Sequence, residues 1–155
     1  MNLRCLIPLG LAAAICFCQD RAEATLGEAA DTIAKDRKAL SGVSQKTLSS
    51  ARYRVQQMAS GTGKTAIREY VSPSGIVFAV AWNGFVRPNL KVLLGSYHND
   101  YQKALSRRAR NPGHREMKLV SERLVVETWG HMRNLQGRAY LPGLLPEGVN
   151  IDEIR

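Results

Sequence analysis

An apolar run near the middle of the chain constrains the fold most. Residues 75–83 read GIVFAVAWN, with Ser72-Pro73-Ser74-Gly75 before the run and Asn83-Gly84 closing it. Pro and Gly in the first of these segments are typical of a tight turn. A run this short and this apolar predicts a central β-strand that is covered on both faces. Strict alternation would separate large from small side chains, with Ile76, Phe78, Val80 and Trp82 on one face and Val77, Ala79 and Ala81 on the other.

The flanking segments predict an antiparallel sheet packed with one main amphipathic helix. Alternating patterns or apolar segments predict strands at residues 52–56, 64–71, 119–120, 123–129 and 137–141. The best helical stripe follows Pro88, which a first helical turn tolerates, and ends at Leu105. Gly95-Ser96 would kink this helix or split it in two. Strands in series, joined by short connections and one strong helix, predict an α+β fold rather than a doubly wound nucleotide-binding fold.

The first 24 residues have the layout of a cleavable secretory signal. Arg4 precedes an apolar run from Cys5 to Cys18, and the small-residue pattern Ala22-Glu23-Ala24 follows. At about 1.5 Å per residue the run reaches roughly 21 Å, short of the ~30 Å hydrocarbon core, which favours a cleaved signal over a retained transmembrane anchor. Cleavage after Ala24 would remove all 3 cysteines, so the mature protein could form neither a disulfide nor a thiolate metal site.

The rest of the chain divides into an N-terminal segment and one domain. Residues 25–40 have roughly helical apolar spacing, whereas residues 41–50 are rich in Ser, Gln and Thr and predict a linker. The predicted organisation is therefore a signal at 1–24, a helix and linker at 25–50 and a single α+β domain at 51–155. Within the domain, residues 142–146 are rich in breakers and should wrap the core irregularly before Asn150 caps a final turn.

The charge of the chain narrows the class of partner. The formal net charge is +9, which favours anionic partners at long range or serves solubility alone. For an exported protein, phosphorylated lipid headgroups, acidic polysaccharide or another periplasmic protein would be nearer at hand than nucleic acid. We expect an anionic envelope partner, no nucleic acid and no cofactor.

Two groups of residues are candidate sites. A basic loop with its flanking residues could bind anions or could simply be solvated, and its members are Arg107, Arg108, Arg110, Arg115 and Lys118. A second group at a strand end could line a small ligand site, and it contains Trp129, His131, Arg133, Arg138 and Tyr140. There His131 could carry a proton while the arginines hold an anion; the alternative is a packed aromatic, a satisfied histidine and surface arginines.

Other motifs are less specific. Gly61-Thr62-Gly63-Lys64-Thr65 ends like a phosphate-binding loop, but that pattern requires Gly where Met58 stands and a helix where a strand is predicted. The three histidines His98, His114 and His131 lack metal-ligand spacing, so no metal site is predicted. No nucleophile elbow indicates a hydrolase.

Several segments of the sequence, in this order along the chain, resemble a family of bacterial exported proteins known as domain of unknown function 2844. They are residues 68–84 (REYVSPSGIVFAVAWNG), 93–97 (LLGSY), 130–133 (GHMR), 137–142 (GRAYLP) and 144–146 (LLP). The resemblance covers nearly the whole mature chain and implies an exported single-domain protein. It implies no activity, cofactor or role for any residue.

Three functions follow as hypotheses. The leading one is a non-enzymatic periplasmic or envelope accessory protein that binds an anionic partner. The second is a small enzyme that uses His131 with Arg133 and Arg138 around an anionic substrate. The third is a structural part of an envelope assembly that docks through an exposed strand edge.

Overall fold

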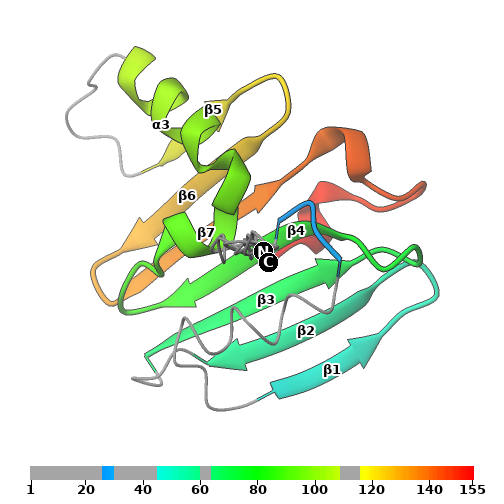
Figure 1. Ribbon diagram of the computed structural model, residues 1–155. Helices are drawn as coiled ribbons and strands as arrows, with labels where there is room; N and C mark the ends of the chain where they lie inside the picture. The colour runs from blue at the N-terminus through cyan, green and yellow to red at the C-terminus, as the bar shows by residue number, and fades with distance from the viewer. Residues whose placement is uncertain (1–25, 30–44, 60–63, 109–115) are drawn as a thin grey trace, which may run out of the picture.

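The computed structural model describes residues 26–29, 45–59, 64–108 and 116–155, and their core is one open antiparallel sheet (Figure 1). Its seven strands lie in the order β1-β2-β3-β4-β7-β6-β5. The strands are β1 (Gln45–Ser49), β2 (Arg54–Ala59), β3 (Thr65–Val71), β4 (Val77–Gly84), β5 (Met117–Val120), β6 (Val125–His131) and β7 (Asn134–Tyr140). The predicted α+β class with an antiparallel sheet is confirmed.

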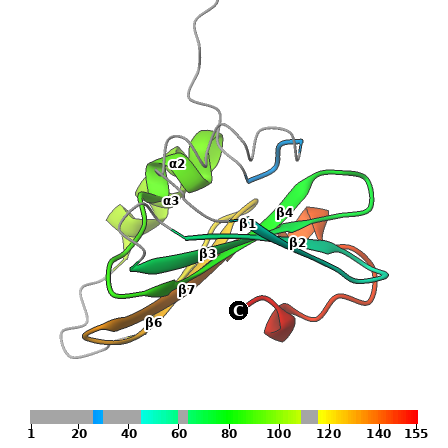
Figure 2. The same ribbon diagram turned by 90° about the horizontal axis from the view of Figure 1, so that it is seen from below.

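The two faces of the sheet are covered by different segments (Figure 2). On one face lie α2 (Leu90–Leu94), the 3-10 turn η2 (Gly95–Tyr97) and α3 (His98–Arg107). On the other lies the C-terminal segment with the 3-10 turns η3 (Pro142–Leu144) and η4 (Ile151–Glu153). Each layer buries its own apolar cluster against the sheet. Strand β4 is buried from Val77 to Trp82, as expected of a central strand covered on both sides.

The predicted division of β4 into a large face and a small face is wrong at its start. The register with β3 shifts between Tyr70 and Val71, so that Ala79 pairs with Tyr70 and Val77 with Val71, while Phe78 is skipped. Phe78 therefore joins Ala79 on the face of the C-terminal segment, whereas Val77 lies on the helical face. An extra residue in one strand reverses the side-chain alternation beyond it, and sequence alternation alone does not reveal this.

The main helix is split at the predicted place. Gly95 has a φ of 39°, and a 3-10 turn separates α2 from α3. Pro88 lies before the helix rather than in its first turn, because Asn89 is the N-cap and its Oδ1 accepts a hydrogen bond from the Lys91 N–H at 3.0 Å. Within the described residues, no helix is long and apolar enough to cross a membrane.

Two predictions for the N-terminal region need correction. The predicted linker contains β1, whose five residues pair with β2. Residues 46–49 are exposed, and an edge strand exposed in this way needs no apolar alternation, so the pattern gave no sign of it. Of the predicted helix at 25–40, residues 26–29 instead form a turn and a bridge from Ala29 to Ile76; residues 25, 30–40 and 41–44 lie outside the described residues.

The remaining segments agree largely with expectation. Strand β6 begins two residues later than predicted and runs on to His131, and β7 begins at Asn134 rather than at Gly137. Asn150 caps η4, with its Oδ1 accepting from the Asp152 N–H at 3.0 Å. The phosphate-loop pattern links two antiparallel strands, β2 and β3, so no helix follows it; residues 60–63 themselves lie outside the described residues.

Candidate ligand-binding clefts

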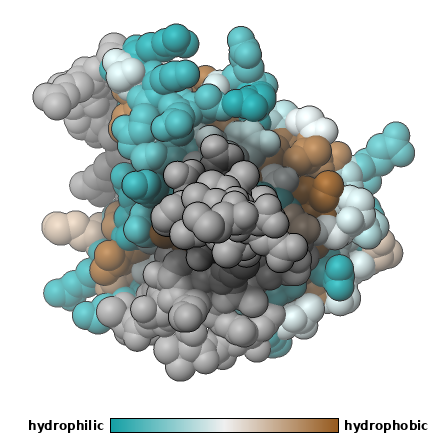
Figure 3. All heavy atoms as spheres, in the orientation of Figure 1, coloured by the Kyte–Doolittle hydropathy of each residue, from teal (hydrophilic) through white to brown (hydrophobic). Residues whose placement is uncertain are grey.

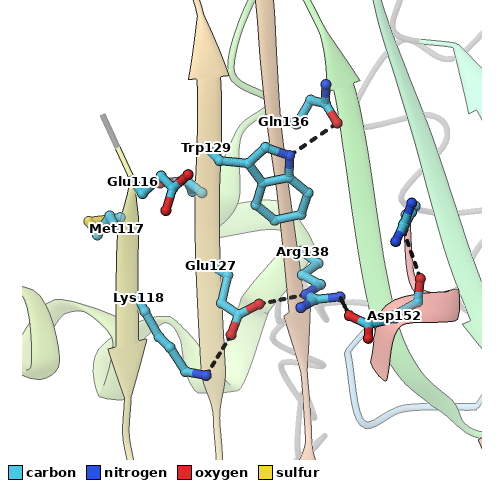
Figure 4. A pocket seen from close by; sticks show the side chains of 10 residues that line it. Glu116, Met117, Lys118, Glu127, Trp129, Gln136, Arg138 and Asp152 are labelled. Carbon is cyan, nitrogen blue, oxygen red and sulfur yellow. Dashed lines mark hydrogen bonds and ion pairs between the residues drawn. The ribbon is translucent and has the colours of Figure 1, made fainter. Parts of the chain in front are cut away.

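Strands β6 and β7 bring a set of polar and aromatic side chains together on the face of the C-terminal segment. Because Glu127 pairs with Arg138 and Trp129 with Gln136, all four side chains project from the same face. They line a cleft of about 660 Å³, which we call the Trp129 cleft (Figure 4). Its lining residues are Glu116, Met117, Lys118, Glu127, Thr128, Trp129, Gln136, Arg138, Asp152 and Arg155.

Glu127 lies between two cations in this cleft. Lys118 Nζ is 2.9 Å from its Oε1, and Arg138 Nε is 2.6 Å from its Oε2. Arg138 Nη1 also donates to the carbonyl of Ile151 at 2.6 Å. The Arg138 side chain is only 14% exposed, so its charge serves chiefly to join β6, β7 and η4.

The cations set the ionisation of Glu127. Burial alone would raise the pKa of this carboxyl, but hydrogen bonds from Lys118 and Arg138, together with their charges, outweigh burial and hold the pKa below its ordinary value. Glu127 is therefore a carboxylate at neutral pH, which suits an acceptor of hydrogen bonds and not a proton donor.

Trp129 forms the aromatic part of the cleft. Its Nε1–H donates to Gln136 Oε1 at 3.2 Å, and Arg138 Cζ lies 5.6 Å from the ring centroid. In Figure 4 the indole lies across β6 and β7, above Glu127 and Arg138 and below Gln136. The residue is partly exposed, so a bound molecule can reach the ring.

The structure separates the residues that the sequence grouped around Trp129. Arg138 and Trp129 line the cleft, but Tyr140 is only 4% exposed and belongs to the apolar cluster under the C-terminal segment. Burial is the main reason why the pKa of Tyr140 is raised.

His131 and Arg133 are exposed at the β6–β7 turn, where Arg133 has a φ of 69°. Arg138 pairs with Glu127, and His131 stands four residues further along β6. At about 3.3 Å per strand residue, His131 and Arg138 lie about 13 Å apart along the sheet. The structure thus does not bring the three residues of the enzyme hypothesis into one cleft.

A second cleft, of about 560 Å³, lies between α3 and β5, and we call it the basic cleft. Its lining residues are Asp100, Lys103, Ala104, Arg107, Arg108, Lys118, Leu119, Val120, Ser121 and Glu122. Hydrophilic side chains gather over this part of the molecule in the space-filling view (Figure 3). Asp100 is neutralised by Arg123, whose Nη2 is 2.8 Å from its Oδ2.

The basic cleft unites part of the predicted anion-binding loop. Arg107 ends α3, Arg108 is its C-cap and Lys118 lies on β5. Arg110 and Arg115 lie outside the described residues. Lys118 lines both the basic cleft and the Trp129 cleft, because β5 is the last strand in the order and its side chains can reach around the edge.

Sequence analysis missed several lining residues. Lys103 stands four residues before Arg107 on α3, and this spacing brings the two side chains together. The predicted helix ended at Leu105, so the sequence placed Arg107 in a loop and did not show this pairing. Glu127 and Gln136 could be found only through the β6–β7 register, because neither residue type is unusual in a strand. Among the described residues, no group of three or more His, Cys, Asp or Glu side chains could hold a metal ion.

A comparison with protein families places the chain in a known family. Residues 22–154 match the model of the family described as "Protein of unknown function (DUF2844)". The chain belongs to the DUF2844 family. Neither the curated proteins nor the solved structures contain a match to the chain. The resemblance seen in the sequence segments is therefore confirmed over nearly the whole chain, and the DUF2844 description leaves the function to be argued from the clefts.

Proposed function

We propose that this DUF2844 protein is an exported, non-enzymatic binding protein whose basic cleft holds an anionic partner of the cell envelope. The observation that carries the proposal is the convergence of Lys103, Arg107 and Arg108 from α3 with Lys118 from β5 around one cleft. The signal pattern at residues 1–24 and the net charge of +9 support export and an anionic partner.

The charges around the cleft favour an anion. The four cations share the cleft with Asp100 and Glu122. Arg123 balances Asp100, and Glu127 pairs with Lys118 at 2.9 Å, although neither Arg123 nor Glu127 lines the cleft. Lys103, Arg107 and Arg108 therefore outnumber the one remaining carboxylate, that of Glu122. Each exposed ion pair contributes only about 0.2–1 kcal/mol. Several cations together produce a field that attracts and orients an anionic surface, with a strong dependence on salt.

The geometry supports binding better than catalysis. A proton carrier must lie within hydrogen-bond reach of the reacting group, yet His131 is exposed at a turn about 13 Å from Arg138 along the sheet. Arg138 in turn is held by Glu127 and by the Ile151 carbonyl.

Cosedimentation with envelope fragments from the bacterium that makes the protein tests the proposal. We expect the bound fraction to fall steeply between about 0.1 M and about 1 M salt, as the Debye length shortens from about 10 Å to about 3 Å. The double variant Arg107→Glu/Arg108→Glu should bind at least about tenfold more weakly at low salt.

The matched control is Lys46→Glu/Arg54→Glu. Lys46 on β1 and Arg54 on β2 are exposed and remote from the basic cleft in the strand order, and the control changes the net charge by the same amount. Binding that survives high salt unchanged, or that falls equally in both double variants, would contradict a specific role of the basic cleft.

A further inference from the structure

The Trp129 cleft is not used by the proposed function. It lies on the face of the sheet opposite the helices, because Arg138 pairs with Ala81, which belongs to the apolar cluster under the C-terminal segment. Its volume of about 660 Å³ falls within the range of about 300–1,000 Å³ that is typical of small-molecule sites. The cleft combines a partly exposed indole with charged and amide side chains.

The charges in this cleft favour an uncharged ligand. Its three cations, Lys118, Arg138 and Arg155, are matched by three carboxylates, those of Glu116, Glu127 and Asp152. A ligand with a net charge would have to compete with the close pairs at Glu127, which measure 2.6 and 2.9 Å. A hydroxyl group avoids this competition, because it can donate to a carboxylate and accept from a cation without displacing either.

The Trp129 indole can bind the apolar face of a sugar ring. The face of an aromatic ring is electron-rich, and the C–H bonds on one face of a sugar ring carry small positive charges that complement it. The bond from Trp129 Nε1 to Gln136 orients the indole before any ligand arrives. Arg138 is likewise fixed by its bonds to Glu127 and Ile151, so binding would order few side chains and lose little entropy.

We propose that the Trp129 cleft is a binding site for an uncharged sugar unit of a glycan, which stacks on Trp129 and directs its hydroxyl groups to Glu127, Gln136 and Arg138. Glu127 is suited to accept hydrogen bonds from the sugar and not to act as the protonated acid that glycosidases require, because its two cations hold it ionised.

Intrinsic fluorescence offers a direct test, because the two tryptophans differ in exposure. Trp82 is only 2% exposed, so a ligand-induced change in emission reports on Trp129. The probes are three neutral oligosaccharides that differ in linkage or in sugar unit: cellotetraose, tetra-N-acetylchitotetraose and maltotetraose. We expect a saturable change with at least one of them, with a Kd of about 1 mM or tighter.

Variants tie the signal to the cleft. Because Trp129→Ala and Trp129→Phe remove the fluorophore, their affinities are measured by calorimetry. We expect Trp129→Ala to weaken binding at least about tenfold and Trp129→Phe to weaken it less, since a smaller aromatic face remains. Phe85→Ala removes an aromatic side chain that is 56% exposed elsewhere and should bind like the wild type.

Salt separates this site from the basic cleft, since binding of a neutral probe should be nearly the same at about 0.1 M and about 1 M salt. The proposal is overturned if none of the probes gives a saturable change up to about 10 mM. It is equally overturned if Trp129→Ala, shown to be folded by circular dichroism, binds as tightly as the wild type.

Discussion

At the scale of single residues, Gly137 shows how tightly the centre of the sheet is packed. It lies on β7 opposite Trp82 of β4, and a Cβ at this position would lie 2.3 Å from Trp82 Cζ2 and 2.8 Å from the Glu127 carbonyl oxygen. Trp82 is almost fully buried, so it cannot swing away. We expect Gly137→Ala to lower the free energy of unfolding by about 2–3 kcal/mol, measured by urea denaturation.

The control for this substitution is Gly143→Ala in η3, where a Cβ would meet nothing within 4 Å. The added methyl group should change stability by less than about 1 kcal/mol, because it meets no neighbour and also restricts the unfolded chain. Equal effects at the two positions would show that contact with Trp82 is not the cause.

Glu127 gives a prediction about acid. Its pKa is lowered in the folded protein, so its ion pairs stabilise the fold above the unfolded pKa, and this stabilisation is lost as the pH falls through the lowered pKa. From about pH 6 to about pH 3, across the ordinary carboxyl pKa, the wild type should lose more unfolding free energy than Glu127→Gln. Denaturant titrations across this range measure the difference.

Glu147→Gln serves as the comparison, because Glu147 is an exposed carboxyl in the C-terminal segment. The Glu147→Gln variant should lose as much unfolding free energy as the wild type over this pH range. If Glu127→Gln also follows the wild type, then the pairs with Lys118 and Arg138 contribute no net stability.

At the scale of elements, the C-terminal segment is bound to the sheet by its last residues. Ile154 is fully buried beside Tyr70 and Phe78. The Tyr70 hydroxyl accepts from the Arg155 N–H at 3.0 Å and donates to the Arg155 carbonyl at 2.9 Å. The segment is thus an integral layer of the fold and covers the face opposite the helices.

We therefore expect Ile154→Ala to cost about 2–4 kcal/mol of unfolding free energy, because it leaves a cavity under η4. Leu144→Ala, at a side chain that is 39% exposed, should cost less than about 1 kcal/mol. Thermal unfolding of both variants checks the prediction. A small effect at Ile154 would mean that the segment detaches from the sheet before the rest unfolds.

Sequence patterns could predict the helices and strands that bury apolar side chains, either on one face or on both faces. Strands β3 and β4, the helical stripe and its break at Gly95 were all visible in this way. Strand β1 was not, because residues 46–49 are exposed and its only signal is pairing with β2. The shift that skips Phe78 depends on how β3 and β4 fit together, which local alternation cannot express.

The same limit applies to the candidate sites. The sequence indicated Trp129 and Arg138, because unusual residues stood close together in a predicted hairpin. It also grouped them with His131 and Arg133, because the register that pairs Trp129 with Gln136 was unknown. The predicted strand began at Gly137, whereas β7 begins at Asn134, so Gln136 lay outside the predicted strand and its pairing with Trp129 could not be seen.

At the scale of the whole molecule, the proposed export makes a prediction about the mature chain. Protein recovered from the cells that make it should begin at Thr25, because cleavage is expected after Ala24. N-terminal sequencing and intact mass measure this directly. A chain that begins at Met1 in a membrane fraction would contradict the export proposal. The assembly hypothesis remains a separate prediction, which monomeric behaviour in every extract would oppose.

The position of Lys118 has a thermodynamic consequence for the two proposed ligands. Its ammonium group bonds to Glu127, yet the residue lines the clefts on both sides of β5. An anion in the basic cleft that draws this ammonium group toward α3 removes one of the two cations paired with Glu127 and leaves Arg138 as the other. The Trp129 cleft then becomes more negative by one charge. Coupling between sites is reciprocal. By whatever factor the bound anion changes the affinity for the sugar, the bound sugar must change the affinity for the anion by the same factor. One flexible side chain can thus link two opposite faces of a rigid sheet without any movement of the backbone.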